Sequence, residues 1–362
     1  MLRTALDSNL KPWSLFRRSV AGLSIFFVTI GCSAGSQAPP GGATAAKGPS
    51  ANPYLDPEEK FPITDPPPAP KPDGNPFKDV KLWIDPESLA MLKANAIRAT
   101  EPQNAAILDK IAKQPMALWL GEWNTNIYRK VQDVVQRANA QGEVPVFIAY
   151  NVPGRDCGQH SAGGLEDDDA YKRWIRRIAA AIDKGAAVII LEPDALPLLD
   201  KCLSPEEQEK RMALIKDAVR VLRQNPKTIV YIDSGHAVWK PAEVMAERLK
   251  KSGIDEAHGF ALNVSNYGPT DQNMEFGRKV SALVGGAHFV IDTSRNGTGY
   301  APEYEWCNPP GRKIGNFPSI DTGDPLVDAF LWLKRPGESD GECNGGPKAG
   351  VFWTERAIEL AK

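Results

Sequence analysis

Seven short apolar runs recur along the chain after residue 115, and within each run apolar residues are continuous rather than alternating with polar ones. Strands of this kind are buried on both faces, as in a parallel sheet covered by helices. The predicted strands are MALWL (116–120), VPVFIAY (144–150), AAVIIL (186–191), TIVYI (228–232), GFALN (259–263), HFVID (288–292) and AFLWL (329–333).

Amphipathic helical segments separate most of these runs. The clearest are AYKRWIRRIAAAIDKG (170–185) and SPEEQEKRMALIKDAVRVLRQN (204–225). The second opens with Ser204 as a predicted N-cap and Glu207 three residues later, which is the pattern of a capping box. Alternation of strands and helices predicts parallel strands joined by crossovers. The fold class is therefore α/β, either a barrel or a doubly wound sheet.

The first 74 residues predict export and a tether. Arg17 and Arg18 precede a short apolar run that ends in TIGC at Cys32, which is the order of a secretory signal over residues 1–32. TIGC resembles a bacterial lipobox, in which Cys32 would carry a lipid anchor; simple secretion and an uncleaved anchor are the alternatives. Residues 33–74 are rich in Pro, Gly and Ala, a composition typical of a disordered linker. We therefore expect a secreted or cell-envelope protein.

Composition and charge narrow the range of partners. The 362 residues, 42% of them apolar, are enough to bury a large core. The formal net charge of −2 gives no reason to expect nucleic acid or an anionic surface as a partner, and it suits an uncharged substrate. A Gly-x-Gly-x-x-Gly or Walker loop follows none of the predicted strands, which argues against nucleotide binding.

Four cysteines follow the linker, and in an exported chain an even number of them favours disulfides. Four cysteines allow three connectivities; pairing neighbours closes the two shortest separate loops, and each bridge would then stabilise the fold by about 4 kcal/mol. A zinc site is the competing interpretation, but Cys-x-x-Cys is missing and the histidines lack ligand spacing, so we expect no metal. The cysteines are Cys157, Cys202, Cys307 and Cys343.

Carboxylates follow four of the predicted strands. In a parallel barrel, reactive groups lie just past the carboxyl ends of the strands. A single Asp in such a place is more often a helix N-cap than a catalytic group. Four acidic residues at the same edge of the sheet are harder to explain by chance. Tryptophans in the same part of the pattern would add flat apolar surfaces. The acids are Asp156, Asp194, Asp233 and Asp340, and the tryptophans are Trp119, Trp239, Trp306 and Trp332.

Grouped acids with aromatic residues and no metal ligands are typical of glycoside hydrolysis, in which one acid protonates the leaving oxygen and another carboxylate assists water. Aromatic faces stack on the apolar faces of sugar rings. In LEPDAL, Pro193 fixes the backbone so that Asp194 projects from the strand end. Nearby negative charge, especially that of Asp156, would raise the pKa of Asp194, as a general acid requires.

Three other classes of function are alternatives to this interpretation. A serine hydrolase is disfavoured because no Gly-x-Ser-x-Gly elbow follows any of the predicted strands and His236 has no obvious nucleophile partner. A non-catalytic glycan-binding surface protein would keep the tryptophans but would not need Asp194 and Asp340 together. A retaining glycosidase with a carboxylate nucleophile is compatible with the spacing.

Seven motifs in fixed order carry a family resemblance: NVPGRDCG, LEPDAL, YIDSGHAVW, LNVSNY, VIDTSRNG, WCNPPGR and LWLKRPGESDG. With these motifs, residues 75–362 resemble the catalytic domain of glycoside hydrolase family six, the secreted cellulases that hydrolyse β-1,4-glucan with inversion. The resemblance implies a distorted parallel (β/α) barrel of about seven strands with its active-site cleft at the carboxyl ends of the strands. It implies no cofactor, and we expect a monomer.

The resemblance also implies roles for individual residues. Asp194 matches the proton donor, and Asp156 matches the aspartate that keeps the pKa of the donor high. Asp340 matches the proposed catalytic base, with a water chain involving Asp156 as the alternative. Asp233 matches a supporting aspartate, and Tyr150 matches the tyrosine that crowds the sugar at the cleavage point. Trp119, His236, Trp239, Asn266, Trp306, Lys334 and Glu338 match substrate-binding positions.

The resemblance further implies the disulfides Cys157–Cys202 and Cys307–Cys343, and it bears on the mode of attack. Exo-acting members roof the cleft with two long loops, one of them before the last disulfide cysteine. Here only two residues separate Asp340 from Cys343. We therefore expect an open cleft and an endo-β-1,4-glucanase, with a cellobiohydrolase of the same family as the alternative.

Overall fold

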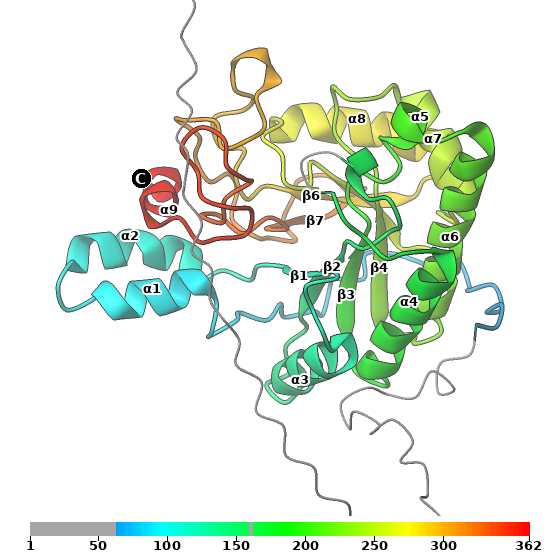
Figure 1. Ribbon diagram of the computed structural model, residues 1–362, viewed down its shortest axis with the longest axis horizontal. Helices are drawn as coiled ribbons and strands as arrows, with labels where there is room; N and C mark the ends of the chain where they lie inside the picture. Colours follow the sequence, from blue (N-terminus) through cyan, green and yellow to red (C-terminus); the bar gives the residue numbers. More distant parts are fainter. Residues whose placement is uncertain (1–62, 159–161) are drawn as a thin grey trace, which may run out of the picture. The chain divides into compact units, whose positions relative to one another are not determined.

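All seven predicted strands form, and each pairs in parallel with the next one along the chain (Figure 1). The computed structural model describes residues 63–158 and 162–362. The α/β class and the distorted seven-stranded barrel are both confirmed within these residues. The strands are β1 (Leu118–Leu120), β2 (Val146–Ala149), β3 (Ala187–Leu191), β4 (Thr228–Asp233), β5 (Gly259–Leu262), β6 (His288–Asp292) and β7 (Val327–Leu331).

Hydrogen bonds beyond the strand ends bring the two edges of the sheet together. The backbone N–H of Ala117 donates to the carbonyl of Trp332 at 3.0 Å. The indole N–H of Trp119 donates to the carbonyl of Leu333 at 2.9 Å. These contacts join β1 and the residue before it with the segment after β7, so the sheet curls and the loops that follow its strands face a common space.

The continuous apolar runs are explained by burial on both faces of the sheet. Ile189 and Leu191 of β3 pack outward into the cluster shared with the covering helices, whereas Val188 and Ile190 point into the barrel. Successive side chains of a strand point to opposite faces, so a strand covered on both sides needs an apolar residue at every position. This is why the strands could be predicted from composition without an alternating pattern.

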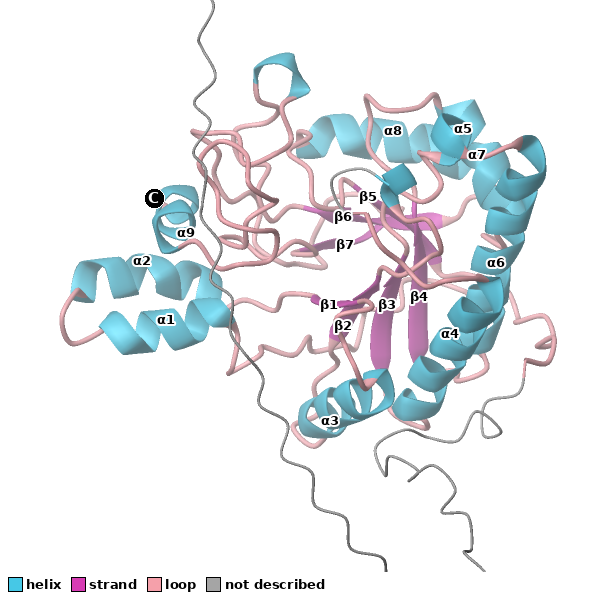
Figure 2. Ribbon diagram, viewed as in Figure 1, coloured by secondary structure: helices cyan, strands magenta, loops and turns pink. Residues whose placement is uncertain are grey.

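Helices surround the sheet (Figure 2). The longest, α6, lies beside α4 on the outer face, and both predicted helices are present. In the described part of the chain, no helix is long and apolar enough to cross a membrane. The helices are α1 (Leu89–Ile97), α2 (Pro102–Ala112), α3 (Ile127–Asn139), α4 (Asp168–Ile182), α5 (Leu199–Cys202), α6 (Pro205–Arg223), α7 (Ala242–Lys251), α8 (Thr270–Leu283) and α9 (Thr354–Ala361).

Trp332 is not a sugar-binding surface, and that prediction is wrong. Its side chain is 1% exposed and packs in a separate apolar cluster formed by α1, α2 and α9. The indole N–H donates to the carbonyl of Asn316 at 2.8 Å, and Phe317 stacks on the ring. The strand ends at Leu331, one residue before Trp332, so the side chain turns toward this cluster instead of the cleft.

The predicted signal over residues 1–32, with Cys32, and most of the predicted linker lie outside the described residues. Residues 63–74 form neither helix nor strand. They nevertheless contact the folded unit: Arg176 of α4 donates to the carbonyl of Thr64 at 2.7 Å, and the N–H of Ala69 donates to Glu256 at 2.8 Å. The end of the proline-rich segment is therefore held against the helical layer.

The capping box at the start of α6 is confirmed and yields a stability prediction. Ser204 Oγ accepts from the N–H of Glu207, and the Glu207 carboxylate accepts from the N–H of Ser204 at 2.7 Å. Ser204→Ala should lower the free energy of unfolding by about 1 kcal/mol, because the N–H of Glu207 loses its acceptor. Urea denaturation measures this change. Ser204→Asp is the control and should remain near the parent; an equal loss in both variants would contradict the capping explanation.

Candidate active site

A cleft of about 1120 Å³ opens where the loops after the strands meet. Its walls come from segments far apart in the sequence, from Leu89 in α1 to Val351 near the C-terminus. Among the predicted catalytic and substrate-binding residues, only Asp233 does not line it. The predicted residues that do are Trp119, Tyr150, Asp156, Asp194, His236, Trp239, Asn266, Trp306, Lys334, Glu338 and Asp340.

Asp194 lies on a strained turn directly after β3. Both Glu192 and Asp194 have left-handed backbone conformations, with φ of +51° and +70°, on either side of Pro193. Residues with a side chain rarely adopt this conformation, and it persists only where surrounding contacts hold it. Proline thus explains only part of the projection of Asp194 that the sequence predicted. The two left-handed residues turn the chain out of the strand direction.

Asp233, at the end of β4, lies beneath this turn. The strand register pairs Leu191 with Ile232, so the segment after β3 runs beside Asp233. The buried Asp233 Oδ2 accepts from the N–H groups of Asp194 and Gly235, at 3.0 and 3.1 Å. Burial raises the pKa of Asp233 to about 7, against the hydrogen bonds from these two N–H groups, which lower it.

The environment of Asp194 favours the un-ionised form of its carboxyl group. Loss of hydration is the largest cause and raises the pKa of Asp194 well above its usual value. The charge of Asp233 adds to this, and that of Asp156 adds less. The sequence interpretation had given Asp156 the main part. Asp233 outweighs it because its carboxylate bonds directly to the backbone of Asp194.

Asp340 has the opposite electrostatic environment. Arg295 donates to its two oxygens at 2.9 and 2.8 Å, and Lys334 Nζ lies 3.2 Å away. Burial alone would raise the pKa of Asp340, but the charges of Arg295 and Lys334 outweigh burial, and the pKa falls to about 2. The Tyr267 hydroxyl is 3.3 Å from Oδ2. Asp340 is therefore an ionised, closely surrounded carboxylate.

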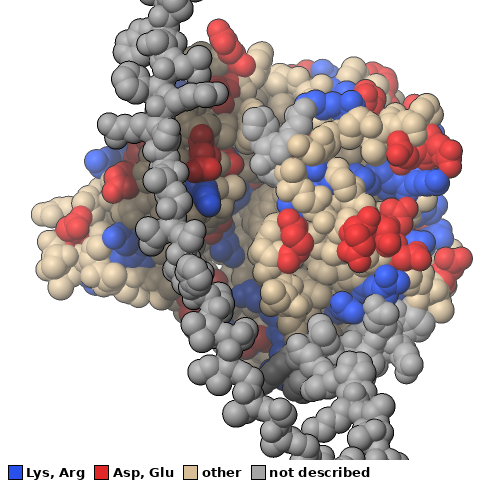
Figure 3. Space-filling view, viewed as in Figure 1, with Lys and Arg blue, Asp and Glu red and all other residues tan. Residues whose placement is uncertain are grey.

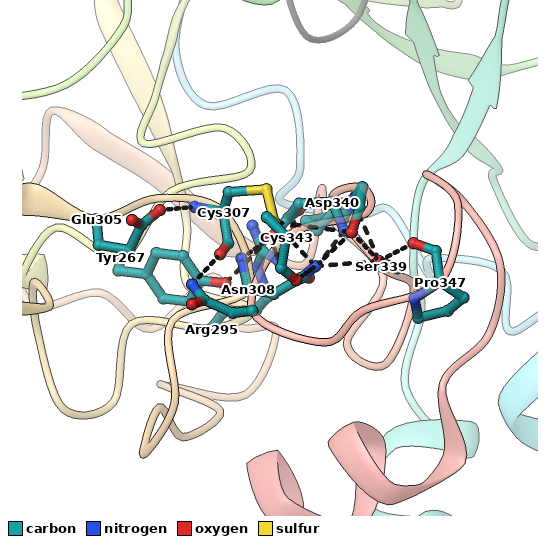
Figure 4. The surroundings of a disulfide bond; sticks show 12 residues. Tyr267, Arg295, Glu305, Cys307, Asn308, Ser339, Asp340, Cys343 and Pro347 are labelled. Carbon is teal, nitrogen blue, oxygen red and sulfur yellow. Dashed lines mark hydrogen bonds and ion pairs between the residues drawn. A yellow bond between two sulfur atoms is a disulfide. The ribbon is translucent and has the colours of Figure 1, made fainter. Parts of the chain in front are cut away.

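A disulfide fixes the loop that carries Asp340 (Figure 4). Cys307 is bonded to Cys343, and Asn308, the next residue after Cys307, bonds to Asp340 twice. The Asn308 N–H donates to Asp340 Oδ2 at 3.1 Å, and Asn308 Oδ1 accepts from the Asp340 N–H at 2.9 Å. The other disulfide is Cys157–Cys202, so the pairing of neighbouring cysteines is confirmed.

Buried carboxylates also connect the loops around the cleft, and sequence reasoning missed them. Glu192 accepts from the N–H groups of Asn151 and Val152, both at the start of the loop that carries Asp156. Asp292, at the end of β6, accepts from four backbone N–H groups. These belong to Ser265, Ser294, Leu333 and Lys334. Each carboxylate accepts hydrogen bonds from N–H groups that lie just past a strand end and therefore have no partner in the sheet.

The aromatic wall near β1 contains one tryptophan that was not predicted. Trp119 meets Tyr150 edge to face, with ring centroids 5.2 Å apart. The Arg155 guanidinium lies 4.3 Å from the Tyr150 ring and 5.5 Å from the Trp123 ring. Trp123 lines the cleft and is 50% exposed. Its position in GEWN, soon after a predicted strand, was the available signal.

Other predicted binding residues have partners that orient them. The Asn266 side chain accepts from the Tyr267 N–H at 2.8 Å. Glu338 pairs with Arg335 at 3.0 Å. Within residues 63–158 and 162–362, no group of three or more His, Cys, Asp or Glu side chains could hold a metal ion. The arrangement offers a proton donor of raised pKa, Asp194, in the same cleft as the ionised Asp340 and several aromatic surfaces.

Comparisons with known proteins agree with this arrangement. Residues 77–362 match the family described as glycosyl hydrolases family 6. Endoglucanase A of Thermobispora bispora is 44% identical over 288 residues, covering 78% of this chain and 62% of that protein. The chain thus spans about three-fifths of the length of that relative.

Solved structures of cellulases are also similar to this chain. The endoglucanase Cel6 from Mycobacterium tuberculosis, in complex with methyl-cellobiosyl-4-deoxy-4-thio-β-D-cellobioside, is 42% identical with a TM-score of 0.75. The match covers 79% of this chain and 98% of that one. The catalytic core of the cellobiohydrolase Cel6A from Chaetomium thermophilum is 26% identical with a TM-score of 0.69, covering 80% of this chain and 98% of that one.

The raised pKa of Asp233 predicts a pH-dependent effect of Asp233→Asn on stability. Below pH 3.8 the group is protonated in both the folded and the unfolded chain. Between pH 3.8 and about 7 the unfolded chain loses this proton first, so folding becomes less favourable as the pH rises. Asparagine does not ionise. The melting temperature of Asp233→Asn relative to the parent should therefore be higher at pH 8 than at pH 4.

A control of opposite sign is Asp109→Asn. A side-chain hydrogen bond from Arg98 lowers the pKa of Asp109 to about 2, so this variant should gain nothing between pH 4 and pH 8. If the difference between Asp233→Asn and the parent were the same at both pH values, Asp233 would not carry a raised pKa.

Proposed function

Since the chain belongs to glycosyl hydrolases family 6, we propose that it is an endo-β-1,4-glucanase that cleaves internal bonds of cellulose or related β-1,4-glucans with inversion. The observation that carries this proposal is that Asp194, which lines the cleft, has its backbone N–H bonded to the buried carboxyl group of Asp233. A carboxyl group whose pKa is raised can hold a proton and give it to a departing glycosidic oxygen.

Asp194 is the general acid in this mechanism. It lines the cleft, and its pKa is raised mainly by loss of hydration. When the glycosidic bond breaks, the leaving oxygen takes the Asp194 proton, and the resulting carboxylate is reprotonated from water after product release. Tyr150 lies in the same wall, edge to face with Trp119, where it can crowd the sugar at the cleavage point and favour a distorted ring.

Inversion requires a water molecule on the opposite side of the sugar, activated by a second carboxylate. Asp340 is ionised, but its pKa of about 2 makes it a weak base, and two cations and an N–H group already contact it. We therefore favour the route through a chain of water molecules involving Asp156, with Asp340 and its cations setting the local potential. Asp156 lines the cleft close enough for its charge to affect Asp194.

A neutral polysaccharide suits the surface as well as the cleft. The face in Figure 3 carries acidic and basic side chains interspersed, in keeping with the formal net charge of −2. The cellobiose-based ligand of the Mycobacterium tuberculosis relative supports a β-1,4-glucan as the substrate. We propose that Trp119, Trp239 and Trp306 stack on successive glucosyl rings.

The endo mode is supported by the relatives and by the loop before the last disulfide. Identity to the two endoglucanases is 44% and 42%, against 26% for the cellobiohydrolase. Asp340 and Cys343 are separated by two residues, too few for a roof over the cleft. Both disulfides fit an oxidising compartment, so we also propose that the protein is secreted or held at the cell envelope. We further propose Cys32 as the site of lipidation and a monomer as the active form.

Asp194→Asn tests the acid assignment. The variant keeps the size of the side chain but has no acidic proton, so hydrolysis of carboxymethylcellulose should fall at least about 100-fold while binding of cello-oligosaccharides persists. Reducing-sugar release and titration calorimetry measure the two properties. Asp200→Asn, an exposed acid paired with Lys240 nearby, is the matched control and should keep its activity. Turnover above a few per cent in Asp194→Asn would reject the assignment.

Viscosity tests the mode of attack. Internal cleavage should lower the viscosity of carboxymethylcellulose steeply for each reducing end released, because one cut in the middle of a chain halves its length. Analysis of the anomer formed from cello-oligosaccharides should show inversion. Slow viscosity loss with accumulating cellobiose would favour the cellobiohydrolase alternative. Binding without any product would favour a glycan-binding protein.

A further inference from the structure

The segment between β6 and β7 brings three aromatic side chains to one wall of the cleft. Tyr300, Tyr304 and Trp306 all line it, although only Trp306 was predicted from the sequence. Tyr304 is 61% exposed and Trp306 is 36% exposed. Exposure of a single aromatic residue is ordinary at a protein surface. These three need a further explanation because they lie together in the wall of one cleft.

Tyr304 is the end of a continuous row of rings. Trp239 and His236 have ring centroids 5.2 Å apart, His236 and Tyr300 5.9 Å, and Tyr300 and Tyr304 5.1 Å. The Tyr300 hydroxyl lies 3.3 Å from His236 Nδ1. Burial lowers the pKa of His236 to about 4, so the ring is neutral near pH 6 and Nδ1 can accept this hydrogen bond. The row therefore runs from a predicted sugar-binding tryptophan to the exposed Tyr304.

The loop that presents Tyr304 is fixed at both ends. Arg312 Nη1 donates to the carbonyls of Gly299 and Tyr300, each at 2.9 Å. On the other side, Glu305 accepts from the N–H of Cys307, which forms the disulfide beside Asp340. A short turn (Pro302–Tyr304) lies between these anchors.

The backbone of this turn is strained. Glu303 and Tyr304 have φ of +55° and +58°, which residues other than glycine rarely adopt, and here two consecutive residues do so. Strain of this kind concentrates at ligand-binding sites, where surrounding contacts maintain it. The strained turn thus holds an apolar ring out of the core and at the edge of the cleft.

We propose that Tyr304, supported by Tyr300, stacks on a glucosyl ring beyond the one held by Trp239, and so adds a binding subsite for longer β-1,4-glucan chains. This inference rests on the proposed glucanase function and deepens it. A tyrosine suits the task because its ring offers an apolar face to the sugar, while its hydroxyl group remains in water and can bond to the sugar hydroxyls.

The experiment compares chain lengths in variants of Tyr304. Tyr304→Asn removes the ring but keeps a residue that tolerates the left-handed backbone, and Tyr304→Trp enlarges the ring. Phe317→Ala is the matched control, since Phe317 is 48% exposed and is not among the residues that line the cleft. The specificity constant kcat/KM is measured for cellotetraose, cellopentaose and cellohexaose.

For Tyr304→Asn, kcat/KM should fall about fivefold on the longest substrate and change little on the shortest. Tyr304→Trp should keep or increase the preference for long chains, and Phe317→Ala should leave it unchanged. An equal effect of Tyr304→Asn at all lengths, or no effect, would overturn the subsite.

The same measurements separate this inference from the proposed function. If the parent hydrolyses cello-oligosaccharides but Tyr304→Asn keeps the parental length dependence, only the subsite is rejected. If the parent neither hydrolyses nor binds any of these oligosaccharides, as judged by product analysis and titration calorimetry, the glucanase function and the subsite are both rejected.

Discussion

The hydrogen bond from the backbone N–H of Asp194 to the buried carboxylate of Asp233 is the interaction on which the site depends. It joins the ends of β3 and β4, helps to hold the left-handed turn at Asp194, and places two acids side by side, where loss of hydration raises the pKa of both. Elsewhere in the cleft, Arg295 and Lys334 keep Asp340 ionised. The environments push the pKa values of the acids apart, and such separation is what assigns acid and carboxylate roles in one site.

Other buried carboxylates around the cleft hold the backbone in the same way. Asp233, Glu192 and Asp292 are each buried, and each accepts backbone N–H groups at a place where the chain leaves the sheet. The Asn308 side chain likewise accepts from the N–H of Asp340, and because Asn308 follows the disulfide-bonded Cys307, this contact links the Asp340 loop to the disulfide. The loops that carry the reactive groups are therefore fixed by polar side chains beneath them, while the apolar sheet supplies the frame.

The strands of the sheet could be predicted from the sequence more fully than the side chains that line the cleft. The strands and the acids after them were predictable because burial on both faces and strand ends leave local patterns. Trp332 was misplaced because its surroundings come from α1, α2 and α9, which are distant in the sequence. Trp123 was missed because it comes soon after a predicted strand but does not directly end one. Tyr304 was missed because a left-handed backbone at glutamate or tyrosine has no sequence signal. The catalytic roles themselves remain predictions.

Carbon-13 NMR of the aspartate side chains is the most direct test of the central claim, with the Asp194 carboxyl signal assigned as the one lost in Asp194→Asn. The account predicts that this signal remains that of a protonated acid well above pH 3.8, the ordinary pKa of the group. The midpoint of its titration should move to lower pH when Asp233 is replaced by asparagine. A signal that titrates at or below pH 3.8 in the parent would contradict the account.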